Sequence, residues 1–148
     1  MPAKLAQCAE IWGYVFKKER HKTEKDALNP LIGDAYAFVG IEARSKLILC
    51  YELGNRDGVT ALAFMRKLET ATGGRFQLTT DGFKPYVGAA DDIFGAAIDF
   101  AQLVKIYSSD EEERERYSPG RVVEAVPVPI RASLIRRRLA HLTWSATT

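Results

Sequence analysis

The sequence predicts an α/β domain with a mixed sheet: three strands, a helix, a strand, a second helix and a last strand. Three observations lead to this prediction. Short apolar runs of strand length are interspersed with two stretches of helical length. Polar or glycine-containing turns separate them. The chain has 148 residues, of which 47% are hydrophobic and 27% charged, which is enough for one domain with its own core.

The first part of the chain contains three predicted strands. Residues Cys8–Phe16 are rich in aromatic and aliphatic side chains, and the basic, polar segment Lys17–Asp26 after them is predicted to be a loop. Gly33–Ile41 and Leu47–Leu53 are two more apolar runs, and the polar turn Glu42–Lys46 between them predicts a hairpin. We therefore expect three antiparallel strands.

Helix and strand signals alternate after the hairpin. Asp57 can cap a helix with one broad apolar face, which Gly73 and Gly74 end. The remaining predicted elements are a strand, a helix and a strand, at Phe76–Thr80, Pro85–Phe94 and Ile98–Tyr107. This is the order of a ribonuclease-H-like fold, here predicted to be incomplete at its C-terminal end.

The composition changes beyond Tyr107. An acidic run, Asp110–Glu115, is followed by an arginine-rich tail that Pro127 and Pro129 interrupt. The tail has no clean helical or strand period, so little of it is expected to pack as a regular element. We therefore place a boundary between a core domain, residues 1–119, and an irregular segment, residues 120–148.

Several classes of protein are disfavoured by composition. A net charge of +2 does not by itself indicate nucleic acid binding. No apolar run reaches the roughly 18 to 20 residues of a membrane span, and no signal peptide is visible, so a cytoplasmic protein is expected. Cys8 and Cys50 lack the spacing of a zinc or redox site and are predicted to be buried free thiols. His21 and His141 are predicted to be solvated.

The remaining candidates for chemistry are carboxylates, because the sequence shows no Ser-His-Asp or Cys-His arrangement. Asp81 ends a predicted strand and precedes Gly82, which lets the backbone turn. A short acid at this place can offer oxygens to a divalent cation. An Asp-Gly pair is also an ordinary turn sequence, so the pattern alone leaves both interpretations open.

An ordered series of segments resembles the DDE transposases of the insertion-element-one type, over Cys8–Pro119. The resemblance implies a ribonuclease-H-like core that cuts and joins DNA. The segments that carry it are Ala9-Glu10-Ile11-Trp12, Tyr14-Val15-Phe16, Gly33-Asp34-Ala35-Tyr36, Ser45-Lys46-Leu47-Ile48, Gly54-Asn55-Arg56-Asp57, Ala63-Phe64-Met65, Gln77-Leu78-Thr79-Thr80-Asp81-Gly82, Pro85-Tyr86 and Ala101-Gln102-Leu103-Val104-Lys105-Ile106-Tyr107.

In that family an Asp, Asp, Glu triad holds two Mg²⁺ or Mn²⁺ ions, which activate a water or a DNA 3′-hydroxyl and stabilise the leaving oxygen. The second acid corresponds to Asp81. The first falls on Ala9, whose methyl group cannot bind a metal. Glu10 is the nearest substitute ligand, but neighbours on a strand point to opposite faces, so its carboxylate is expected to face away from Asp81. Metal binding is therefore expected to be weak.

The third acid of the family belongs to a Val-Glu-Arg motif on a helix, and no such motif follows Tyr107. The run Glu111–Glu115 follows the strand too closely to replace it. Back-translated in a shifted frame, Ala140–Thr148 can spell Thr-Ser-Tyr-Val-Glu-Arg-Asn-Asn. We therefore hypothesise a frameshift near Arg131 in a truncated transposase. On this hypothesis the arginines Arg136–Arg138 result from the shifted reading frame and have no selected function.

Three functions remain open at this level. The first is a transposase by descent that is catalytically inactive. The second is a non-catalytic module that binds intact transposase or DNA, through pairing or self-association, and inhibits it. The third is an active nuclease that uses Glu10 and a tail acid. Because only Met1–Gln7 precede the first strand, specific recognition of element ends is not expected. Without a covering helix, Trp12, Phe38 and Ala101–Tyr107 are expected to be partly exposed.

Overall fold

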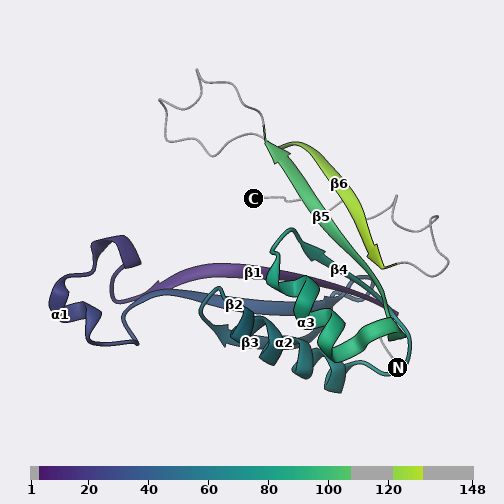
Figure 1. Ribbon diagram of the computed structural model, residues 1–148, viewed down its shortest axis with the longest axis horizontal. Helices are drawn as coiled ribbons and strands as arrows, with labels where there is room; N and C mark the ends of the chain where they lie inside the picture. Colours follow the sequence, from purple (N-terminus) through teal and green to yellow (C-terminus); the bar gives the residue numbers. More distant parts are fainter. Residues whose placement is uncertain (1–3, 108–121, 132–148) are drawn as a thin grey trace.

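The computed structural model describes residues 4–107 and 122–131, which form one sheet with helices on one face (Figure 1). The strands follow the spatial order β3-β2-β1-β4-β5-β6. The elements along the chain are β1 (Leu5–Val15), the 3-10 helix η1 (Glu19–His21), α1 (Glu24–Ala27), β2 (Gly33–Glu42), β3 (Ile48–Gly54), α2 (Gly58–Ala71), β4 (Gln77–Asp81), α3 (Pro85–Phe94), the 3-10 helix η2 (Gly95–Ala97), β5 (Asp99–Tyr107) and β6 (Val122–Arg131).

The strand directions confirm the predicted fold class. β1 is antiparallel to β2, and β2 to β3, as a meander of three strands requires. β4 lies parallel to β1 on the other side, and β5 lies parallel to β4. The sheet is therefore mixed, with a helical connection between β3 and β4 and another between β4 and β5. This is the ribonuclease-H-like arrangement.

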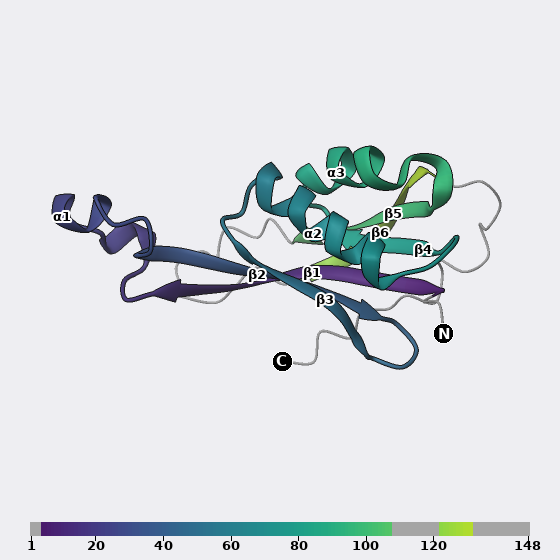
Figure 2. The ribbon, with the colours of Figure 1, turned by 90° about the horizontal axis from the view of Figure 1, so that it is seen from below.

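The two longer helices, α2 and α3, pack side by side on the same face of the sheet (Figure 2). α2 begins where the Asp57 side chain accepts a hydrogen bond from the backbone N–H of Thr60, at 2.9 Å. Such a cap satisfies one of the backbone donors that a helix start leaves free. The face that α2 turns to the sheet carries three large, fully buried side chains, Phe64, Met65 and Leu68.

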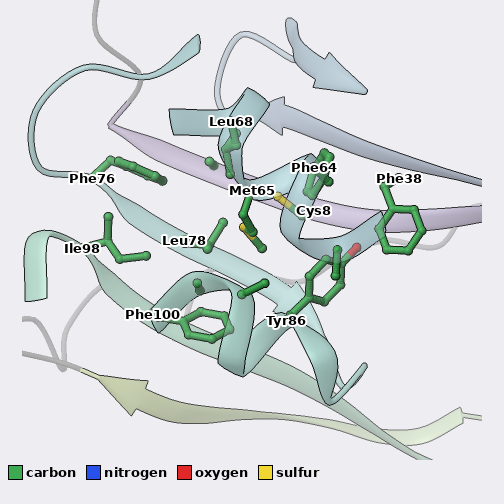
Figure 3. Packing of buried hydrophobic residues seen from close by; sticks show 14 residues of the cluster. Cys8, Phe38, Phe64, Met65, Leu68, Phe76, Leu78, Tyr86, Ile98 and Phe100 are labelled. Carbon is green, nitrogen blue, oxygen red and sulfur yellow. The ribbon is translucent and has the colours of Figure 1, made fainter. Parts of the chain in front are cut away.

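The core lies between these helices and the central strands (Figure 3). Phe38, on β2, is fully buried, so the expectation that it would be partly exposed is wrong. Its ring lies 5.9 Å from those of Phe64 and Tyr86 and 6.1 Å from that of Phe83, centroid to centroid. The helical layer therefore covers Phe38, and the sequence alone did not show how far along β2 this layer extends.

The exposure predicted for two other places is correct in part. Trp12 is 47% exposed, as expected. In β5, Val104 and Ile106 are 38% and 45% exposed, whereas Ala101 and Gln102 are buried. The first half of β5 is thus covered and only its second half is open.

A strand is found where an irregular tail was expected. β6 runs antiparallel to β5, with Pro127 opposite Leu103 and Pro129 opposite Ala101. Proline lacks a backbone N–H, but an edge strand needs hydrogen bonds on one side only and tolerates it. The expectation of no regular element is therefore wrong for Val122–Arg131. The boundary at residue 119 stays a prediction, because the rest of the tail lies outside the described residues.

The predictions for the cysteines, the histidines and the loop after β1 can also be compared with the described residues. Cys8 is buried and Cys50 half-buried, and both are free thiols. His21 is exposed at the end of η1, as expected, while His141 lies outside the described residues. The segment predicted as a loop contains η1 and α1. None of the helices in the described part of the chain is long and apolar enough to cross a membrane.

Candidate functional site

Asp81 is the last residue of β4, a strand that lies between β1 and β5 in the middle of the sheet. Its Oδ1 accepts a hydrogen bond from the backbone N–H of Phe83, at 3.0 Å, which folds the carboxylate into the turn after the strand. The Gln102 side chain holds this turn from the neighbouring strand, because its Nε2 donates to the Phe83 carbonyl at 3.1 Å. Asp81 therefore has a fixed place at the carboxyl end of a parallel strand, where α/β proteins commonly bind ligands.

Ala9 lies beside Asp81. The parallel register between β1 and β4 pairs Cys8 with Thr80, and Ala9 and Asp81 are the next residues along each strand. Both also border the same pocket. An acid in place of Ala9 would therefore stand next to Asp81 across the two strands and would border the same pocket.

Glu10 also meets Asp81, which corrects the expectation that it would face away. The Glu10 side chain is only 5% exposed and forms a hydrogen bond with Asp81. Side chains point alternately to the two faces of a sheet within a strand. Asp81 is the last residue of its strand, and the hydrogen bond from the Phe83 backbone turns its carboxylate out of this alternation. The longer glutamate side chain can then reach it.

Arg56 completes the polar cluster from the loop before α2. Its Nε lies 3.7 Å from Oε1 of Glu10, a distance that allows charge attraction but is long for a hydrogen bond. The guanidinium lies 4.2 Å from the centroid of the Phe83 ring, in a cation–π contact. The segment Gly54-Asn55-Arg56-Asp57 was part of the family resemblance, but sequence reasoning did not connect Arg56 to the site.

The acidity of Glu10 is strongly perturbed. Burial, followed by the hydrogen bond and the charge of Asp81, raises the pKa of Glu10 to about 8, and the charge of Arg56 offsets only part of this rise. A pKa raised this far favours the protonated form of Glu10 at neutral pH. Two carboxyl groups in contact commonly share a proton in this way.

The pocket at this site has a volume of about 190 Å³. It opens between three neighbouring strands, with Lys105 from β5 at its border. Its lining residues are Gln7, Cys8, Ala9, Glu10, Thr79, Thr80, Asp81, Leu103 and Lys105. Burial, followed by the charges of Cys50, Asp81 and Glu10, raises the pKa of the Cys8 thiol well above its ordinary value, so Cys8 stays uncharged here.

The donor set does not fit the two-ion site that the resemblance implies. Within residues 4–107 and 122–131 no group of three or more His, Cys, Asp or Glu is placed to hold a metal ion. Ala9 offers no oxygen, and one oxygen of Asp81 accepts a hydrogen bond from the backbone. The acidic run Glu111–Glu115 and the tail from Ala140 lie outside the described residues.

Comparisons with known proteins yield structural neighbours only. No family model and no curated protein matches the chain. A piggyBac transposase, solved as a synaptic complex with hairpin DNA, is 13% identical over 80% of this chain and 27% of its own, with a TM-score of 0.46. Endonuclease V from Bacillus subtilis is 10% identical over 72% of this chain and 46% of its own, with a TM-score of 0.36. The chain spans about a quarter and just under half of these two proteins.

Proposed function

We propose that the chain is a DDE-transposase catalytic core by descent, whose function was metal-dependent DNA strand cleavage and transfer, and that it is catalytically inactive. The observation that carries the proposal is the pair Ala9 and Asp81 at adjacent positions of two parallel strands. In the family that the sequence resembles, these two positions hold the first and second acids. This chain keeps the second and has a methyl group in place of the first.

The donor set supports the proposed inactivity. Magnesium retains its own waters unless several rigid oxygen ligands replace them in near-octahedral geometry. Here the cluster has two carboxyl groups, and burial and the contact with Asp81 raise the pKa of Glu10, which makes it a poorer ligand at neutral pH. Weak binding of a single ion is the most that the described residues support.

The test restores the missing ligand. We expect Ala9→Asp to raise Mn²⁺ affinity, measured by calorimetry at pH 7, over that of the unchanged chain. If the added carboxylate contributes about 1.4 kcal/mol, the gain is about tenfold. Ala9→Asn is the matched control, because it has the same size and no charge. A gain that is equal for Asn and Asp, or no gain at all, would contradict the proposed geometry.

Activity is the second readout. DNA strand cleavage and joining are measured with Mg²⁺ or Mn²⁺ for the unchanged chain, for Asp81→Asn, and for Ala9→Asp combined with a tail that carries the Val-Glu-Arg motif. We expect activity only in the repaired chain. Cleavage by the unchanged chain that Asp81→Asn abolishes would show that the chain is an active nuclease that needs Asp81, and would contradict the proposed inactivity.

One observation favours a second candidate, a non-catalytic module that binds an intact transposase and inhibits it. No helix of the described residues covers the sheet face opposite α2 and α3 (Figure 2). Ile11, Ala37 and Leu53 form a row across three strands on that face, and Ile11 and Leu53 are 62% and 66% exposed. Adding the chain to an active transposase of the same family tests this candidate, which predicts a stable complex and lower activity.

A further inference from the structure

The strands β1 and β2 extend well past the helical layer as a two-stranded ribbon, with α1 at its end (Figures 1 and 2). We call residues 11–37 the arm. Neither the catalytic site nor the core uses the outer part of the arm. The surface of the arm is nevertheless less polar than is usual for a protein surface, because several large aromatic and aliphatic residues are exposed there.

An aromatic row runs along β1 in the arm. Trp12 and Tyr14 are 47% and 52% exposed, and their ring centroids lie 5.9 Å apart. They occupy alternate positions of the strand and thus lie on the same face. Phe16 follows at the end of the strand and is 79% exposed. Its φ of 65° lies in the left-handed region, a strained conformation for a bulky residue, and such strain is often found at ligand sites.

Cations accompany this row. The Nζ of Lys18 lies 5.2 Å from the Trp12 ring and 5.7 Å from the Tyr14 ring, centroid distances at which an ammonium group is attracted to an aromatic face. Arg20 and Lys25 are exposed close by in the chain and have no acidic partner within the described residues. These cations are therefore free to meet an anion.

The end of the arm is held in shape by polar contacts. Lys17 forms an ion pair with Asp26 at 2.7 Å, and Thr23 and Asp26 cap α1 reciprocally. The carboxylate of Asp34 accepts from the backbone N–H of Glu19, and the carboxylate of Glu19 accepts in turn from that of Asp34. The aromatic row and its cations are thus presented by an ordered structure, which lowers the entropy lost on binding.

We propose that the arm binds single-stranded nucleic acid, with bases stacked on Trp12 and Tyr14 and the backbone phosphates held by Lys18 and Arg20. Exposed aromatic faces beside free cations are the combination that single-strand binding proteins use, because every unpaired base has a face to stack and every nucleotide a charge. In a duplex the bases are already stacked on each other and cannot use the rings. The inference concerns binding without a metal ion and stands whether or not the proposed transposase descent is correct.

Tryptophan fluorescence gives a direct test, because the chain has only two tryptophans, Trp12 and Trp144. In a Trp144→Phe background all emission reports on the arm. The full chain is titrated in EDTA with a thymidine oligonucleotide of about 16 nucleotides, the upper end of a single-strand binding site. We expect quenching of Trp12 emission that saturates, and much weaker binding of a duplex of the same length.

Three variants divide the binding into its parts. Tyr14→Ala is expected to weaken binding about tenfold, the effect of one lost base stack, with an unchanged melting temperature because Tyr14 is exposed. Lys18→Gln keeps an aliphatic stem and removes one phosphate contact, which should lower the slope of log K against log salt by about 0.7. Lys46→Gln, an equal charge change in the turn at the other end of β2, is the control and should leave the slope unchanged.

Several results would overturn the proposal. These are an absence of quenching, equal affinity for duplex and single strand, or the same effect of Lys18→Gln and Lys46→Gln. Light scattering on the protein without nucleic acid gives a further result that could overturn the proposal. Association that grows with concentration and disappears in Tyr14→Ala would mean that the arm is a contact between copies of the chain.

Discussion

The two halves of β1 differ in burial although they belong to one continuous strand. In the half under the helices, the side chains on the helix-facing side are small and buried, namely Ala6 at 0% and Cys8 at 4% exposed. In the arm, the same side carries large aromatic residues that are half exposed, Trp12 and Tyr14. A residue's size and hydrophobicity therefore predict its burial poorly in this strand.

The two halves of β1 differ because the helical layer leaves little room for side chains on the part of the sheet that it covers. A Cβ atom on Gly40, which lies opposite Cys8, would come within 3.3 Å of both Leu68 and Phe64. The covered half of the sheet thus needs small residues, because α2 already fills the volume with large ones. Trp12 and Tyr14 in the arm have no helix of the described residues packed over them, so large side chains fit there.

The largest expected effect sets Phe38 against Trp12. Phe38→Ala removes a fully buried ring and should lower the free energy of unfolding by about 3 to 5 kcal/mol. Trp12→Ala removes a larger, half-exposed ring and should cost about 0.5 kcal/mol or less. Urea denaturation of both variants measures the difference. Equal losses would show that the arm is as well packed as the core and would invalidate the comparison.

A smaller effect is expected at the boundary between the two halves, where Glu10 is buried. Its pKa rises from 4.5 unfolded to about 8 in the folded chain, so the folded state binds the proton more tightly. The stabilising contribution of the proton is fully present below about pH 4.5, and it is lost as pH rises through about 8. Arg56 and nearby solvent limit its size.

The measurement is the melting temperature in EDTA between pH 5.5 and 9. We expect it to fall with rising pH in the unchanged chain and to fall less in Glu10→Gln, whose amide cannot ionise. Glu52→Gln is the control, because Glu52 is a partly buried carboxylate of the same sheet that forms an ion pair with Lys67 at 2.8 Å. Parallel pH profiles for the unchanged chain and Glu10→Gln would show that Glu10 is not the titrating group.

The smallest effect tests the covering layer itself. Asp57→Ala removes the cap of α2 and should cost about 1 kcal/mol of stability. Hydrogen exchange should speed up in α2 and in the backbone of Phe38, and should be unchanged at Trp12 in the arm. Faster exchange along the whole of β1 would mean that its two halves open together.

Much of the fold could be predicted from the sequence. The apolar runs gave every strand of β1 to β5 within three residues at each end, and Pro85–Phe94 matches α3 at both ends. These elements are fixed by local patterns, such as the Asp57 cap and the turn in which Glu42 accepts from the Ser45 backbone. Asp81 was likewise predicted at the end of its strand.

The site was predicted less completely, because its contacts are tertiary. Glu10 reaches Asp81 only because a hydrogen bond from Phe83 turns the aspartate, and no strand pattern encodes that turn. Arg56 enters the cluster from a loop that is far away in the sequence. The sequence does not predict β6, because Pro127 and Pro129 normally interrupt a strand, although they are compatible with a strand that has one free side.

Those prolines have a consequence for how the sheet can grow. Within the described residues β6 and β3 are its two borders. Pro127 and Pro129 remove N–H groups from β6, so a further strand would find an incomplete ladder there. β3 has no proline and keeps every backbone N–H, although its Tyr51 carbonyl accepts a hydrogen bond from Nζ of Lys67. If two copies join into one larger sheet, β3 is therefore the more favourable of the two borders that the described residues form.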